Sequence, residues 1–207
     1  MVSCSLVTNP VIEHFIAKFR DARTSTYDCI LCVENISFFL AGEVSKHLLR
    51  KNVSIQTPLG VKVCSVIAED IVLIPVLRAG LSMLSSFQRM FPDCNTGFMW
   101  AHRDHNGCAI VDKYKIPVAL LGKTVIILDT MLATSGTINA CADIISQHNP
   151  RQIVVASIMA TEYGIEHCSP RIAGIITVEV SDNLDKNLYI SPGVGDSGDR
   201  LYGQAEA

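Results

Sequence analysis

Two different spacings of hydrophobic residues follow one another along this chain. Over residues 9–50 apolar residues recur at helical spacing, and Asn9-Pro10 is typical of a helix start, with Asn as the cap and Pro at the first position. Residues 53–67 instead alternate between apolar and polar side chains on both sides of Pro58-Leu59-Gly60. Alternation around turn-forming residues predicts a small β-hairpin, an appendage to the domain that follows.

From residue 70 onward, strand-like apolar runs alternate with helical patterns. Strands are predicted over residues 71–77, 96–101, 124–129, 152–159 and 172–180, and helices over 80–90, 136–147 and a short stretch near Gly164. This order predicts one α/β domain over residues 1–207, with a mostly parallel sheet flanked by helices. We expect local distortion at Pro75, because proline donates no ladder hydrogen bond. After Val180 the glycine-rich chain is predicted to be loop.

Composition narrows the class of protein. Of the 207 residues, 49% are hydrophobic and 18% are charged, which excludes intrinsic disorder and suggests that another subunit covers some surface. The formal net charge of -3 argues against binding along a nucleic-acid backbone. Apolar runs are too short for a membrane span and the first ten residues lack signal-peptide features, so we expect a cytoplasmic protein. The eight cysteines, Cys29 and Cys32 among them, are expected to be reduced thiols, mostly in the core.

The strongest local motif is T-V-I-I-L-D-T-M-L-A-T-S-G-T at residues 124–137. A buried strand ends in Asp129, small and hydroxyl residues follow, and a helix then begins. Ligands of open α/β sheets bind at the carboxyl ends of strands, and backbone N–H groups at a helix start bind phosphate. With Asp129 accepting hydrogen bonds from a sugar, the motif predicts a ribose 5-phosphate pocket. The alternative is an ordinary strand-loop-helix connection with a capping hydroxyl.

Three segments in order carry a family resemblance. Residues 124–137 resemble the phosphoribosyl-diphosphate (PRPP) signature of type I phosphoribosyltransferases. P-V-L-R-A-G-L-S-M at 75–83 and Y-I-S-P-G-V-G-D-S-G-D-R-L-Y-G at 189–203 resemble the uracil phosphoribosyltransferases. The resemblance implies the type I phosphoribosyltransferase fold, with the hairpin as a hood. It also implies transfer of phosphoribosyl from PRPP to N1 of uracil, which gives UMP and pyrophosphate.

The resemblance also implies site residues. Catalytic roles fall on Asp129, Arg103 and Asp196. PRPP binding falls on Arg78, Arg103, Asp129, Thr130, Met131, Leu132, Ala133, Thr134, Ser135, Gly136, Thr137 and Asp196, and uracil binding on Ile190, Gly195, Asp196 and Ser197. Arginine suits the pyrophosphate because its planar fork binds phosphate oxygens in pairs. Backbone groups of the glycine-rich loop would read the uracil edge.

The same resemblance bears on cofactors and partners. Mg²⁺ is expected to be carried mainly by the pyrophosphate of PRPP and by water, with no dedicated protein site. A homodimer or a higher homo-oligomer is implied, and activation by GTP is left open. Two alternatives remain: a PRPP-dependent transferase for a purine or orotate, and a non-catalytic nucleotide sensor or RNA-binding regulator on the same fold.

Several residues depart from the family pattern. Thr130 stands where the family usually has Pro, Ser135 where it has Gly, Thr137 where Ser is common, and Tyr163 where Glu is usual. Ser135 would distort the phosphate cradle if its φ must be positive, or would supply one more hydroxyl. His102 and His105 have the spacing of metal ligands on a turn, but without an evident third ligand we expect solvated side chains.

Overall fold

A computed structural model describes residues 2–103, 109–116 and 119–204, with the side chain of Arg103 outside the description. Its main sheet has the strand order β1-β10-β9-β8-β4-β6-β7. These strands are β1 (Ser3–Leu6), β4 (Ile71–Leu77), β6 (Phe98–Arg103), β7 (Ala109–Lys115), β8 (Thr124–Leu132), β9 (Gln152–Thr161) and β10 (Ile172–Thr177). Short strands β5 (Asn95–Thr96) and β11 (Glu179–Ser181) pair with β4 and β9. In this sheet only the β6–β7 pairing is antiparallel among the described strands, so the predicted mostly parallel sheet is confirmed.

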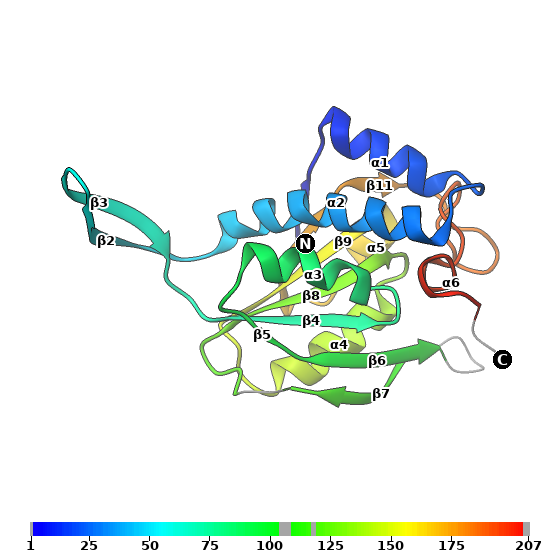
Figure 1. The fold of residues 1–207 in the computed structure, drawn as a ribbon. Coiled ribbons are helices and arrows are strands. Elements are labelled where there is room, and N and C mark those ends of the chain that lie inside the picture. The colour runs from blue at the N-terminus through cyan, green and yellow to red at the C-terminus, as the bar shows by residue number, and fades with distance from the viewer. Residues whose placement is uncertain (1, 104–108, 117–118, 205–207) are drawn as a thin grey trace.

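Helices cover both faces of the sheet (Figure 1). Helices α1 (Pro10–Arg20), α2 (Thr26–Val44) and α3 (Leu81–Met90) lie on one face, and α4 (Gly136–Ser146) lies on the other. Successive strand residues point to opposite faces, so Leu73 and Ile126 pack under the first group whereas Ile74 and Ile127 pack against α4. The shorter elements are η1 (Ser45–His47), α5 (Glu162–Glu166) and α6 (Ser197–Tyr202).

Local signals explain where two of these elements begin and end. The Asn9 side chain accepts hydrogen bonds from the backbone N–H groups of Val11 and Ile12, which confirms the predicted start of α1. The ladder between β4 and β8 ends at Pro75, and the next residues of β4 pair with β6 on the other side. The strand therefore continues past the proline, but it no longer pairs with β8 there.

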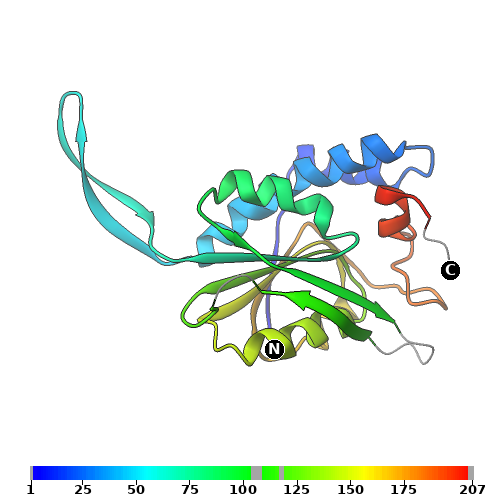
Figure 2. The ribbon, with the colours of Figure 1, turned by 60° about the horizontal axis from the view of Figure 1, so that its bottom comes forward.

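The predicted hairpin is confirmed and stands apart from the domain (Figure 2). Strands β2 (Arg50–Thr57) and β3 (Gly60–Ile67) form a two-stranded arm that extends away from the sheet and helices. At its base, the side chain of Glu69 accepts hydrogen bonds from Arg151 at 2.8 and 2.9 Å and from the Leu49 backbone N–H. The arm is thus fixed where it leaves the domain and solvated along its length.

The sequence prediction missed three elements. Strand β1 precedes the first predicted helix, and β7 lies where no strand was expected. The prediction of loop after Val180 was wrong for residues 197–202, because the Asp196 side chain caps a short helix there by accepting from the Asp199 N–H at 2.9 Å. Cys29 and Cys32 are buried in the core as expected, and the described cysteines form no disulfide. No helix in the described ranges has the length and hydropathy needed to cross a membrane.

Candidate active site

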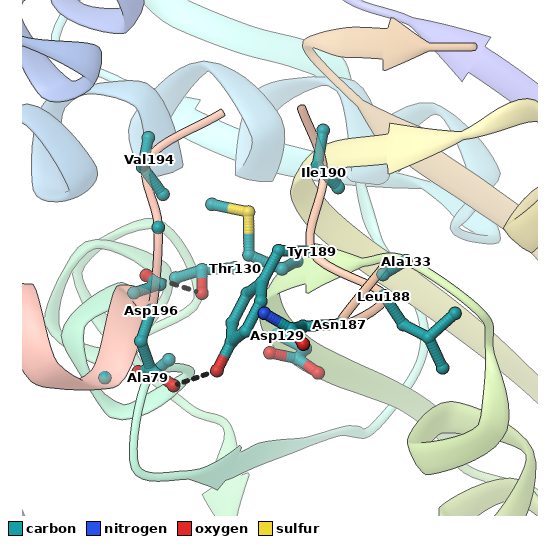
Figure 3. A pocket seen from close by; sticks show the side chains of 14 residues that line it. Ala79, Asp129, Thr130, Ala133, Asn187, Leu188, Tyr189, Ile190, Val194 and Asp196 are labelled. Carbon is teal, nitrogen blue, oxygen red and sulfur yellow. Dashed lines mark hydrogen bonds between the residues drawn. The ribbon is translucent and has the colours of Figure 1, made fainter. Parts of the chain in front are cut away.

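All three resembling segments meet at a cavity of about 400 Å³ beside the carboxyl ends of β4 and β8 (Figure 3). It is lined by Ala79, Asp129, Thr130, Met131, Ala133, Asn187, Leu188, Tyr189, Ile190, Val194, Gly195, Asp196, Ser197 and Gly198. The residues predicted to read uracil therefore face the middle of the predicted PRPP motif, from Asp129 to Ala133. Polar groups converging on an apolar wall are typical of a small-molecule site.

A second cavity of about 370 Å³ adjoins the first. The two share Ala79, Asp129, Asp196 and Gly198 in their linings. The second adds Val76, Leu77, Arg78, Trp100, Ala101, His102 and Thr137. Two chambers thus meet at a wall that carries two carboxylates, and one chamber holds an arginine.

Asp129 lies near the end of β8 at this shared wall. It is partly exposed, yet protein surrounds most of its carboxyl group, and burial raises its pKa to about 7. Hydrogen bonds from the backbone N–H groups of Met131 and Thr130 oppose that rise. The turn from β4 to α3 comes close to this point because residue 80 is glycine, and a Cβ there would collide with the Leu128 carbonyl oxygen.

The predicted phosphate cradle is the loop that leads into α4. Ser135 adopts a left-handed conformation with φ of 63°, so this position does require a positive φ. Its buried hydroxyl donates to the Gly164 carbonyl and lies 3.1 Å from the Cys168 sulfur. The hydroxyl therefore holds the loop against α5 and is not directed to a ligand. Among the described residues no side chain caps α4, so its first backbone N–H groups are available to an anion as far as that part of the chain shows.

Thr161 and Gly164 support the cradle, and sequence reasoning assigned neither a role. The Thr161 hydroxyl donates to the Ala133 carbonyl at 2.5 Å and accepts from the Gly164 N–H at 2.8 Å. A Cβ on residue 164 would lie 2.6 Å from the Ala133 carbonyl oxygen, so this contact requires glycine. The sequence signal that could have indicated this contact was a glycine shortly after a predicted buried strand.

Arg78 lies in the second chamber and is held by the C-terminal helix. One guanidinium nitrogen is 2.5 Å from the Asp199 carboxylate, and the other donates to the Gly203 carbonyl at 3.0 Å. Asp199, which sequence reasoning also missed, orients the arginine. Arg200 in turn donates to the carbonyls of Phe19 and Asp21 at 2.6 and 2.7 Å, which anchors α6 to the end of α1.

Asp196 closes the other side of the shared wall. One carboxylate oxygen caps α6, and the other accepts from the Tyr189 hydroxyl at 3.3 Å (Figure 3). Nearby, the buried Thr130 hydroxyl donates to the Ser197 hydroxyl at 2.9 Å. Thr130, where the family usually has proline, thereby ties β8 to the start of α6.

Not every predicted residue lines a chamber. Leu132 packs in the core, and Thr134, Ser135 and Gly136 belong to the cradle loop and helix start outside both linings. The Arg103 backbone ends β6, while its side chain and His105 lie outside the described residues. Within the described ranges, no three His, Cys, Asp or Glu side chains gather closely enough to hold a metal ion.

The family model and the full-length relatives agree on one family. A family model for uracil phosphoribosyltransferase matches residues 6–204. Uracil phosphoribosyltransferases of Clostridium kluyveri and Dictyoglomus turgidum are 33% and 32% identical, covering 98% and 96% of this chain and 99% and 98% of their own lengths. The solved AQ2163 protein of Aquifex aeolicus superposes with a TM-score of 0.89 at 31% identity, over 97% of this chain and 98% of its own.

A solved structure with much lower sequence identity has the same fold. A hypoxanthine phosphoribosyltransferase of Staphylococcus aureus matches 76% of this chain and 79% of its own, with a TM-score of 0.52 at 12% identity, which shows a shared fold alone. The match to relatives named for uracil, by contrast, spans nearly the whole chain and includes all three resembling segments. The chain belongs to the uracil phosphoribosyltransferase family.

Proposed function

We propose that this enzyme binds uracil in the first chamber and the pyrophosphate of PRPP in the second, with ribose C1 between them at Asp129 and Asp196. The shared wall is the observation that carries this assignment. The attacking N1 must reach C1 from the side opposite to the departing pyrophosphate oxygen. Two chambers joined at one wall allow this geometry. Formation of labelled UMP from labelled uracil and PRPP tests the overall reaction.

The substrate's negative charges match the donors at the site. The 5-phosphate would bind at the first backbone N–H groups of α4 and at the Thr134 and Thr137 hydroxyls. Arg78 would bind the pyrophosphate in the second chamber. Mg²⁺ fits the shared wall as a hydrated ion on pyrophosphate oxygens, because Asp129 and Asp196 offer carboxylate oxygens there. When bound, the ion would neutralise charge on the leaving group.

The exposed arm supports a homodimer. Leu59, in the turn before β3, is 100% exposed. Val61 and Val63 on β3 are 72% and 61% exposed. An isolated two-stranded hairpin is marginal in water, so an arm this apolar is best stabilised by a second subunit. We infer that this arm packs against a second copy of the chain.

Thr134→Val is expected to raise the KM for PRPP several-fold and to leave the KM for uracil nearly unchanged. The substitution keeps the shape but removes a hydroxyl donor to the 5-phosphate. Steady-state kinetics with each substrate varied measures both constants. Thr26→Val, an exposed threonine at the start of α2 and outside both linings, is the matched control. Equal changes in the two KM values would contradict this placement.

The pH dependence of kcat/KM for PRPP is expected to report Asp129. Burial raises this pKa to about 7, so the carboxyl group is neutral below that pH and charged above it. The charged form stabilises a cationic ribose, so kcat/KM should fall as pH falls through 7. Asp129→Asn should remove this step and lower kcat and kcat/KM together, on the order of 10²-fold. Near-normal kcat in this variant would show that Asp129 only shapes the loop.

Base choice is expected to follow the hydrogen-bonding edge of uracil. Backbone groups at Ile190 and at 195–197 line the chamber and would match O2, N3–H and O4. Uracil and 5-fluorouracil should both react, because fluorine at C5 leaves that edge intact. Cytosine should be rejected ~10⁴-fold or more, since its edge leaves buried groups unpaired. Orotate should fail because its carboxylate would approach Asp196, and hypoxanthine should also fail.

Pyrophosphate release with each of the five bases, PRPP and magnesium checks this order. Turnover of hypoxanthine or orotate faster than uracil would overturn the assignment of the first chamber.

A double substitution on the arm, Val61→Lys with Val63→Lys, is expected to convert the dimer to a monomer. Two charges on this apolar surface would have to be desolvated in the interface. Light scattering after size-exclusion chromatography measures the mass, and Lys62→Gln between them on the same strand is the control. A wild-type protein that is already monomeric, or a charged variant that stays dimeric, would contradict the role of the arm.

A further inference from the structure

A histidine–aspartate pair stands at the edge of the second chamber and has no role so far. His102 on β6 lines this chamber together with Arg78 and Trp100. Its Nδ1 atom is 2.9 Å from a carboxylate oxygen of Asp112 on β7. Both side chains are 45% exposed, so the pair is accessible from solvent and is not part of the core.

An irregularity in the β6–β7 ladder brings the pair together. Trp100 lies opposite Lys113, whereas the next residue, Ala101, lies opposite Val111. Asp112 is therefore one extra residue in β7, and two residues of that strand face one residue of β6. Such bulges redirect side chains and occur often beside active sites. Here the extra residue supplies the carboxylate that binds the His102 ring.

The Asp112 contact decides how the imidazole is presented. A carboxylate at Nδ1 accepts a hydrogen from that nitrogen and so fixes the orientation of the ring. In the ion-paired form both ring nitrogens carry hydrogen, and Nε2–H remains available as a donor. An anion bound in the chamber would accept a hydrogen bond from Nε2–H.

We propose that His102, oriented by Asp112, binds the leaving pyrophosphate through Nε2–H. As the C1–O bond breaks, its electron pair moves onto the pyrophosphate oxygen, and negative charge grows in the second chamber. A charge-assisted hydrogen bond stabilises that charge without any proton being transferred. His102 is then a catalytic residue and Asp112 a positioning residue. The proposal rests on the assignment of pyrophosphate to the second chamber.

Product inhibition by pyrophosphate tests the proposal in the intact enzyme. His102→Gln keeps a polar side chain but removes the charge, and should raise the inhibition constant for pyrophosphate about tenfold or more. The KM for uracil should stay unchanged, which a general loss of structure would not allow. His102→Lys restores a cation and should recover part of the affinity. His148→Gln, an exposed histidine at the end of α4, is the control.

Asp112→Asn separates positioning from direct contact. It should weaken pyrophosphate binding less than His102→Gln does, and the double variant should be no weaker than His102→Gln alone, because Asp112 acts through the histidine. Unchanged inhibition by pyrophosphate in His102→Gln would overturn the proposal, as would equal losses for pyrophosphate and uracil. Formation of UMP by the wild-type enzyme is a separate result, so failure here would leave the reaction itself intact.

Discussion

The ion pair between Arg78 and Asp199 is the contact on which the organisation of the site depends. It joins the end of β4 to α6, two segments 121 residues apart in the chain, at a distance of 2.5 Å. The same helix is held to the end of α1 by Arg200 and to β8 by the hydrogen bond between Thr130 and Ser197. Through these contacts the C-terminal segment closes over the open end of the sheet and divides the space into two chambers.

Closure by this segment also sets the electrostatics of the shared wall. Asp129 lies beneath it, and the loss of water around the carboxyl group raises its pKa to about 7. Asp196 is held differently, with both oxygens accepting hydrogen bonds from within the C-terminal segment. The two carboxylates of one site thus have different environments, which suits one to respond to the charge of the ribose and the other to hold the loop.

The sequence predicted those parts of the fold in which burial leaves a clear hydrophobic pattern. Strands β4 and β8 each contain a run of apolar residues, and Asp129 lies in β8 directly after its run. Helix α6 was missed because its six residues have a mixed pattern. In the structure it is capped by Asp196 and anchored through Arg200, and neither contact leaves a periodic signal. Strand β7 is mostly exposed, so its sequence carries little hydrophobic pattern.

The sequence motifs predicted residues that line the candidate site, but not the residues that hold them in place. Asp129 and the 189–198 segment were brought together as the resemblance implied. The contacts of Thr161 with Ala133, of Asp199 with Arg78 and of Asp112 with His102 join separate segments, so no local spacing indicates them. The choice at Ser135 between backbone strain and an extra ligand depended on φ, which the sequence does not contain.

A crystal structure with UMP and pyrophosphate bound is the most direct test of the two-chamber account. The account predicts the uracil ring against Ile190 and residues 195–197, and the pyrophosphate beside Arg78 and His102, with the ribose at Asp129. Pyrophosphate located outside the second chamber, or a base located on the Arg78 side of the shared wall, would contradict it.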